Sequence, residues 1–342
     1  MASTLKKATS ALAAVSLAGV GLAVAAAPAQ AATDIKIGVT AINSDGALQY
    51  AIDNGIFAKN GINVTEVIAF PAPPPSIAAL AAGAIQFTYT PTIPAINAYE
   101  NGGVALRIVA PADGYDRASL AKAKKNAAVA KQLDDTGVCA NPSSGIKGWK
   151  DLPGKTVAVP ARGAQAEVTI VAAVKNAGGD PSKINWTTLP PGQAPDAVKN
   201  GTIDAGFTVE PFVTACLESG MVDVGRPGVQ FFDTESAIGV WVTTQDYANK
   251  NPAVVKAFQK SMYEVHVFAN RSKANMNKIL LASTKITEVS PDVALAANPP
   301  IYPLYVTRTD VLRPAQKMLD LGFLKKPADI SGILVKQYRP GN

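Results

Sequence analysis

Histidine and cysteine are scarce in this sequence of 342 residues, which has one histidine, His266, and two cysteines, Cys139 and Cys216. One histidine supplies neither a histidine-based catalytic triad nor a metal site with several imidazole ligands. His266 falls in a helical run beside Met262 and Val265, so we expect a structural role for it. The residues therefore predict no catalytic site, no metal and no cofactor.

Phosphate-binding motifs are missing as well. The chain has no Gly-x-x-x-x-Gly-Lys-Ser/Thr loop and no strand followed by Gly-x-Gly-x-x-Gly. Nucleotide-dependent chemistry is therefore not expected from the sequence.

The first residues have the pattern of an export signal. Lys6 and Lys7 provide positive charge, an apolar stretch runs from Ala11 to Ala27, and Ala29-Gln30-Ala31 has the small-x-small form that signal peptidase cleaves. We therefore predict a signal peptide over residues 1–31. A membrane-spanning helix is the alternative, but the stretch consists largely of Ala, Gly and Ser, which favour insertion only weakly.

The predicted cleavage point has no cysteine beside it, so the thioether-linked lipid that tethers many exported receptors has no attachment site. We expect a mature protein that is periplasmic or secreted, soluble and without a lipid anchor. In that oxidising compartment, Cys139 and Cys216 predict a disulfide. Two buried free thiols are the alternative, because cysteine is common in protein cores.

The charge of the chain is mildly positive. Without Lys6 and Lys7, 30 basic residues stand against 26 acidic ones, a balance that suits an anionic ligand. The densest basic segment, Lys122 to Lys131, has no interleaved aromatic residues, so we interpret it as a solvated helix face. We expect no nucleic-acid partner.

Short β-branched strands alternate with short helices from residue 35 to residue 110, and again from residue 137 to residue 219. This alternation predicts two α/β lobes, each with a parallel sheet that helices cover on both faces. Beyond a strand over residues 238–243, helices predominate. Residues 117–132 predict one surface helix, and residues 165–176 predict another that ends before Gly178-Gly179.

Four strings of residues resemble the periplasmic substrate-binding proteins of the nitrate, sulfonate, taurine and thiamine-precursor importers. They occur in the order and spacing of that family through nearly the whole mature chain. The strings are residues 51–57 (AIDNGIF) with 61–64 (GINV), 79–87 (ALAAGAIQF), 149–160 (WKDLPGKTVAVP), and 200–206 (NGTIDAG) with 210–212 (EPF).

The resemblance implies a periplasmic binding protein-like type II fold, in which two α/β lobes are joined by two hinge crossings and close on a ligand. It places lobe I at residues 32–112 and 229–342, and lobe II at residues 113–228. The chain departs from the family at Arg162-Gly163-Ala164-Gln165, where Gly-Ser is expected, and in a longer lysine-rich segment.

Ligands of such sheets bind at the carboxyl ends of the strands. We single out Arg162, because its guanidinium offers forked donors to a carboxylate or sulfonate. Gly163, Ala164 and Gln165 follow at the start of a helix, where free N–H groups favour an anion. The other candidates lie in loops after strands: Asn43, Ser44, Ser76, Thr90, Tyr115, Glu210 and Phe212.

Each candidate also has a structural alternative. Arg162 could be a solvated arginine, the hydroxyl groups could be helix caps, and Tyr115 and Phe212 could belong to the core. Glu210 would oppose an anion unless a cation such as Arg162 were its partner.

The functional hypothesis is a receptor for an ABC importer that delivers a small organic anion, a sulfonate or a carboxylate, to a membrane permease. We expect a monomer. The alternative ligand is a neutral heterocycle such as a thiamine-precursor pyrimidine, and a sensor domain or an enzyme is a third possibility. A pyrimidine-synthesising enzyme uses a related fold, but its cysteine-rich string and active-site histidine have no counterpart here.

Overall fold

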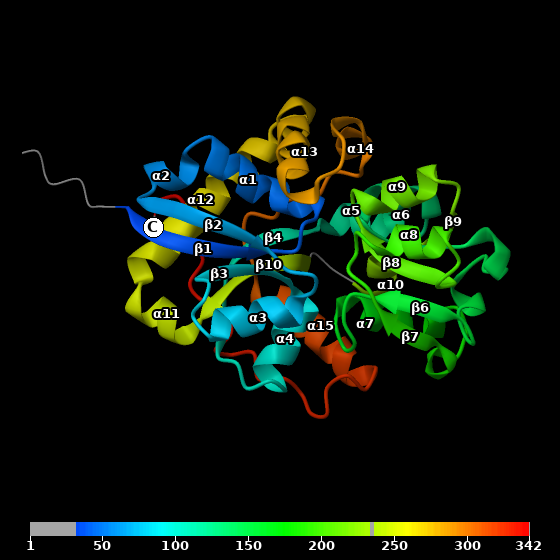
Figure 1. Ribbon diagram of the computed structural model, residues 1–342. Coiled ribbons are helices and arrows are strands. Elements are labelled where there is room, and N and C mark those ends of the chain that lie inside the picture. Colours follow the sequence, from blue (N-terminus) through cyan, green and yellow to red (C-terminus); the bar gives the residue numbers. More distant parts are fainter. Residues whose placement is uncertain (1–31, 233–235, 342) are drawn as a thin grey trace, which may run out of the picture. The chain divides into compact units, whose positions relative to one another are not determined.

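The computed structural model describes residues 32–232 and 236–341, and the predicted signal peptide over residues 1–31 lies outside them. The described chain contains two five-stranded sheets, here called sheet A and sheet B (Figure 1). Sheet A has the order β2-β1-β3-β10-β4, and sheet B has the order β7-β6-β8-β5-β9. The strands of sheet A are β1 (Thr33–Val39), β2 (Ile62–Ala69), β3 (Phe87–Pro91), β4 (Leu106–Tyr115) and β10 (Ser236–Thr244). The strands of sheet B are β5 (Thr136–Ala140), β6 (Thr156–Val159), β7 (Asn185–Thr188), β8 (Ala205–Val209) and β9 (Val222–Gly225).

Each sheet contains one strand that runs against the others, so the prediction of purely parallel sheets is wrong. In sheet A, β10 is antiparallel to β3 and β4. In sheet B, β5 is antiparallel to β8 and β9. Both are the first strand after the chain passes from one sheet to the other. Such a strand enters its sheet from the opposite side, and local strand–helix alternation does not reveal this.

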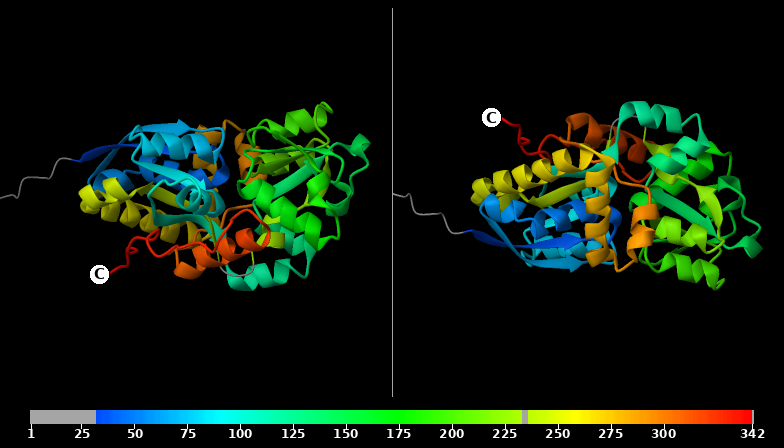
Figure 2. Two further views of the ribbon diagram at one scale, coloured as in Figure 1. Left: turned by 90° about the horizontal axis from the view of Figure 1, so that it is seen from below. Right: turned by 90° about the horizontal axis from the view of Figure 1, so that it is seen from above.

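Helices cover both faces of sheet A. Phe258 and Met262 are buried on one face with Ile37 of β1, while Ile93 and Met318 are buried on the other with residues of β10. Figure 2 shows the blue and yellow helices on the side of sheet A, while the orange α14 lies next to the green elements of sheet B. The helices are α1 (Gly46–Asp53), α2 (Ile56–Lys59), α3 (Pro73–Ala81), α4 (Thr92–Glu100), α11 (Gln245–Lys250), α12 (Pro252–Asn270), α13 (Lys273–Thr287), α14 (Pro291–Ala296) and α15 (Arg308–Asp320).

A second set of helices accompanies sheet B. They are α5 (Arg117–Ala123), α6 (Ala127–Leu133), α7 (Gln165–Asn176), α8 (Ala194–Lys199), α9 (Phe212–Glu218) and α10 (Pro227–Phe231). The lysine-rich segment forms two helices, because the Asn126 side chain accepts hydrogen bonds from Ala128 N and Val129 N and starts a new one. The predicted disulfide is confirmed: Cys139 of β5 is bonded to Cys216 of α9.

The chain leaves sheet A through β4 and returns to it through β10. The predicted boundary between residues 112 and 113 falls inside β4, and the boundary between residues 228 and 229 falls inside α10. The lobe limits themselves therefore stay a prediction.

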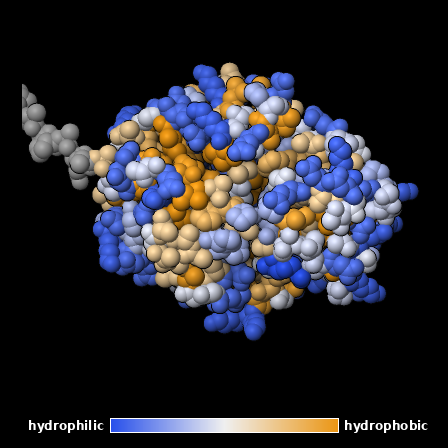
Figure 3. Space-filling model, viewed as in Figure 1, coloured by the Kyte–Doolittle hydropathy of each residue, from blue (hydrophilic) through white to orange (hydrophobic). Residues whose placement is uncertain are grey.

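The surface of the described residues exposes few large apolar side chains. Leu281 of α13 and Leu295 of α14 are the two that are largely exposed, and Figure 3 shows hydrophobic residues among hydrophilic ones near these helices. Within residues 32–232 and 236–341, no helix is both long and apolar enough to cross a membrane.

Candidate functional site

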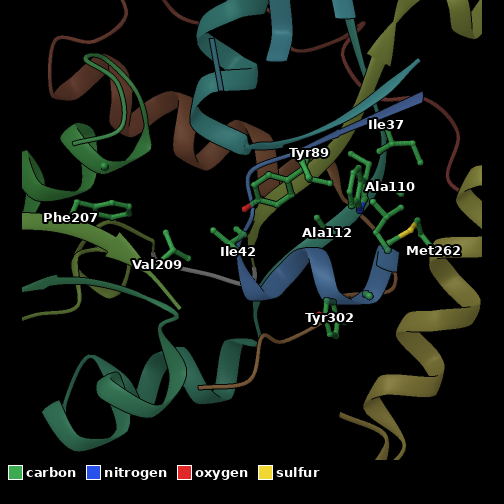
Figure 4. Packing of buried hydrophobic residues seen from close by; sticks show 14 of the residues in the cluster. Ile37, Ile42, Tyr89, Ala110, Ala112, Phe207, Val209, Met262 and Tyr302 are labelled. Carbon is green, nitrogen blue, oxygen red and sulfur yellow. The ribbon is translucent and has the colours of Figure 1, made fainter. Parts of the chain in front are cut away.

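A cavity of about 50 Å³ lies between sheets A and B. Residues at the carboxyl ends of the parallel strands meet there with residues at the amino ends of β5 and β10, as expected for a ligand site in this type of sheet. Figure 4 shows Ile42 and Tyr89 on the sheet A side, and Phe207 and Val209 on the sheet B side. The lining residues are Thr40, Ile42, Pro73, Tyr89, Pro91, Asp113, Asp135, Thr136, Pro160, Gln165, Ala166, Pro191, Phe207, Val209 and Ile238.

Two buried carboxyl groups reach this cavity, Asp113 of β4 and Asp135 just before β5, which are 2% and 6% exposed. Tyr89 Oη donates a hydrogen bond to Asp113 Oδ2 at 3.2 Å, and Ser44 Oγ donates to Asp135 Oδ2 at 3.3 Å. Asp113 Oδ1 and Gln165 Oε1 are buried, and neither meets a donor in hydrogen-bonding geometry among the described residues. The cavity therefore contains acceptors that the protein itself does not use.

Burial raises the pKa of both carboxyl groups. Desolvation is the main cause for Asp113, and the charge of Asp134 adds to it. Desolvation also raises the pKa of Asp135 well above its usual range, helped by the charge of Asp113. No lysine, arginine or histidine is among the described residues that line the cavity. The cavity lining thus offers no cation that would favour the ionised form of either carboxyl group.

Gly239 of β10 permits the close approach of Tyr89 and Asp113. A Cβ atom at position 239 would lie 2.5 Å from the Tyr89 ring and 2.6 Å from Asp113 Oδ1, closer than non-bonded atoms come. The pairing of β10 with β4 is irregular at this residue, as at a β-bulge. The phenol–carboxylate pair therefore depends on a glycine in the neighbouring strand.

Arg162, the central residue of the predicted anion site, does not line the cavity. Its Nε and Nη2 atoms donate to Glu167 Oε2 and Oε1 at 3.0 and 2.8 Å, and its side chain is 55% exposed. Gly163 N donates to Glu167 Oε2 at 2.5 Å. A carboxylate of the chain itself thus occupies the start of α7, where an anionic ligand was predicted. Of the four residues in that string, only Gln165 lines the cavity.

Asn43 and Glu210 link the lobes and are not among the lining residues. Asn43 N donates to Glu210 O at 3.0 Å, and Asn43 Nδ2 donates to Asn298 O at 2.8 Å. The Glu210 carboxylate accepts hydrogen bonds from Thr214 N and Thr214 Oγ1 at 3.0 and 3.1 Å, and burial raises its pKa. Of these contacts, the hydrogen bond from Asn43 N to Glu210 O joins the two lobes.

The remaining candidates make local contacts. Ser76 Oγ donates to Pro73 O at 2.9 Å, and Thr90 Oγ1 donates to Pro91 O at 3.2 Å. The Tyr115 ring packs against Phe232 with centroids 5.9 Å apart. The last three candidates lie elsewhere around the site: Ala164 immediately before α7, Phe212 against Gly192, and Ser44 beside Asp135.

Sequence reasoning missed Tyr89, Asp113 and Asp135. A signal was present, because Asp113 lies in the largely apolar β4 and Asp135 immediately precedes the largely apolar β5. A buried carboxyl group in such a strand needs a partner, and that requirement identifies it as a candidate.

His266 is buried in α12, and its Nδ1 atom lies 2.8 Å from Pro303 O. Burial lowers its pKa to about 4, so the ring is neutral near pH 7. Across the described part of the chain, no group of His, Cys, Asp and Glu residues is arranged to hold a metal ion.

Two mixed α/β sheets packed against helices, with a cavity between them, define the class of fold. The chain belongs to the NMT1-like family, which it matches over residues 28–282. It is 35% identical over 117 residues to the taurine-binding periplasmic protein of Escherichia coli (strain K12), or 33% of this chain and 34% of that one. It is 28% identical over 217 residues to the putative aliphatic sulfonates-binding protein of the same organism, or 64% of this chain and 61% of that one. The matches thus span about a third and about three fifths of these relatives.

Solved structures share the fold. The alkanesulfonate-binding protein SsuA from Xanthomonas axonopodis pv. citri, bound to MOPS, superposes with a TM-score of 0.71 at 16% identity, over 89% of this chain and 99% of that chain. The desulfurization enzyme DSZB does so with a TM-score of 0.60 at 12% identity, over 88% and 96%. The predicted type II fold is confirmed, and the fold by itself does not separate binding from catalysis.

Proposed function

We propose that this protein is the solute-binding receptor of an ABC importer. The observation that carries the proposal is the cavity between the sheets, which is lined from both lobes by strand ends and unused polar atoms. The names of the relatives support the same role, since both are binding proteins. In this proposal the mature chain is a soluble, monomeric periplasmic or secreted protein without a lipid anchor, and it docks on a membrane permease.

The proposal assigns residues 32–112 and 229–342 to lobe I and residues 113–228 to lobe II, with the ligand between them. Contacts such as Asn43 N to Glu210 O join the lobes on one side of the cavity, and Asn97 Nδ2 to Gly163 O joins them elsewhere at 3.4 Å. A receptor of this type opens at its hinge to admit the ligand and then closes over it.

The first candidate ligand is a small organic anion, a sulfonate or a carboxylate. The relatives' names, taurine-binding and aliphatic sulfonates-binding, support this class. The lining residues favour a second candidate, a nitrogen heterocycle with N–H donors, because Asp113, Asp135 and Gln165 present acceptors and no lining residue presents a cation.

Thermal-shift screening followed by calorimetry tests the receptor role. The panel contains alkylsulfonates, taurine, benzoates, phthalates, nitrate, amines and pyrimidines. A true ligand at a hundredfold excess over its Kd adds about 2.7 kcal/mol to the free energy of unfolding. Absence of any stabilising solute from such a panel would contradict the receptor function.

An enzyme is the alternative function, because the fold also occurs in a desulfurization enzyme. Incubating each hit with the protein and following its concentration by chromatography distinguishes the two. A receptor leaves the solute unchanged in stoichiometric complex, whereas turnover beyond one equivalent would favour an enzyme.

A further inference from the structure

The cavity of this protein contains buried acceptor atoms that lack a donor. Asp113 Oδ1 and Gln165 Oε1 are buried without a hydrogen-bond partner among the described residues, and both side chains line the cavity. A buried acceptor without a donor costs free energy, so its presence in a folded protein indicates a missing partner. The Tyr89 hydroxyl group already donates its hydrogen bond to Asp113, and the Ser44 hydroxyl group donates its hydrogen bond to Asp135.

We infer, on the basis of the proposed receptor function, that the cavity binds its ligand through a cationic N–H group, an ammonium or amidinium, held by Asp113, Asp135 and Gln165. Such a group supplies the donors that the acceptors lack and the positive charge that the carboxylates lack. A sulfonate or carboxylate placed against the same atoms would be repelled. An organic anion therefore binds here only if it also carries such a cation.

The charges around the cavity support this assignment. Several titratable groups interact electrostatically with the Asp113 or Asp135 carboxyl group: Asp45, Asp134, Glu210, Tyr89, Tyr115 and Tyr302. Arg226 interacts with Glu210. Arg226 Nη1 already donates to Asp223 Oδ1 at 2.8 Å. Arg226 thus lowers the pKa of Glu210 while it is itself bonded to Asp223, and it is not among the groups that shift the pKa of Asp113 or Asp135.

The rest of the lining restricts the body of the ligand. Ile42, Phe207, Val209 and Ile238 are apolar, and proline rings contribute to the remaining wall. A cationic head on a small apolar or aromatic body matches this division, with the head at the carboxylates and the body against the apolar side chains. Benzamidine, a planar amidinium on an aromatic ring, presents this chemistry, and the cavity of about 50 Å³ has to widen by opening of the lobes to admit it.

Matched pairs of probes test the inference on the wild-type protein. Benzamidine is compared with benzoate, and taurine is compared with isethionate, which replaces the ammonium by a hydroxyl. In each pair of which a member binds, calorimetry is expected to show that the cationic member binds at least about tenfold more tightly. The other member lacks the charged hydrogen bond to the carboxylates. Equal or tighter binding of benzoate and isethionate would overturn the inference and leave the receptor function standing. Binding of none of the four contradicts the inference, and an empty wider panel contradicts the receptor function as well.

An isosteric variant locates the contact. Asp113→Asn removes the charge and keeps an oxygen for the Tyr89 hydroxyl, so it should weaken benzamidine or taurine binding by about 10- to 100-fold. The control is Asp134→Asn, which removes a buried charge next to Asp135 but outside the lining residues. It should have the smaller effect on affinity. A larger effect of Asp134→Asn, or unchanged affinity in Asp113→Asn with an intact melting transition, would refute the contact.

Proton exchange gives a readout that does not depend on any variant. A cation beside Asp113 and Asp135 lowers their pKa from the raised values of the empty site, so binding releases protons. Calorimetry of benzamidine in buffers of different ionisation enthalpy should show this release, and affinity should rise with pH. Proton uptake on binding would contradict the inference.

Discussion

Two buried carboxylates at the start of α7 and at the end of β4 have opposite surroundings. Glu167 accepts hydrogen bonds from Arg162 Nε, Arg162 Nη2 and Gly163 N. Asp113 Oδ2 accepts a hydrogen bond from Tyr89 Oη, while its buried Oδ1 atom has no partner in full hydrogen-bond geometry among the described residues. A buried charge with complete hydrogen bonds contributes to the fold, whereas a buried acceptor without a donor indicates where a ligand binds.

Glu167→Ala should have the largest effect on stability. The change removes the acceptor of three hydrogen bonds and leaves Gly163 N and the Arg162 guanidinium without it, at a cost of about 1 to 3 kcal/mol. Urea denaturation measures the loss, and Glu167→Gln serves as the control because its amide oxygen can still accept one bond. Unchanged stability in Glu167→Ala would break the comparison.

Asp113→Asn should act in the opposite direction. Burial raises the pKa of Asp113, which means that its ionised form opposes folding near pH 7. Removing the charge should therefore stabilise the empty protein by about 1 kcal/mol, as is common at functional sites. The same urea measurement checks this, and a clear loss of stability would show that the carboxylate supports the fold.

Arg162→Ala sharpens the difference between the two sites. Because the side chain is more than half exposed, the loss of its ion pair should cost no more than about 1 kcal/mol. Affinity for any solute that binds in the cavity should stay the same, because Arg162 does not line it. Calorimetry with the tightest-binding solute measures this. Tenfold weaker binding of an anionic solute by Arg162→Ala would support the original hypothesis of an anion site at Arg162.

The pH dependence of stability should be small but diagnostic. Burial raises the pKa of Asp45 from 3.8 to about 7, so the folded chain binds this proton more tightly and stability falls as pH rises through 7. His266 has the opposite sign, because its pKa falls from 6.5 to about 4, and it acts only between those values. From pH 6.5 to 7.5 the unfolding free energy should therefore decrease, by well under about 1 kcal/mol per carboxyl group. Asp45→Asn should flatten this slope in chemical denaturation, and an increase with pH in the wild type would contradict the assignment.

Much of the fold could be predicted because it follows from local patterns. The helix over residues 165–176 was predicted with the bounds that the structure has, since an apolar side and a Gly-Gly stop define it. The directions of β5 and β10 could not be predicted, because they depend on the lobe from which each strand arrives. The prediction of a single helix over residues 117–132 was wrong for a local reason, because the Asn126 side chain caps the start of a second helix.

The candidate site was less predictable than the fold. Gln165 was singled out because it follows a strand end, and it lines the cavity. The prediction for Arg162 did not take into account its partner Glu167, five residues on. Asp113 and Asp135 were missed because sequence spacing does not show that strands from two sheets bring them to one cavity.

A crystal structure with the tightest solute from the screen tests the central claim most directly. The account predicts that the solute lies in the cavity between the sheets, with a nitrogen within hydrogen-bond distance of Asp113 Oδ1 and Gln165. A solute bound instead at Arg162 and the start of α7, with Glu167 displaced and the cavity empty, would contradict it.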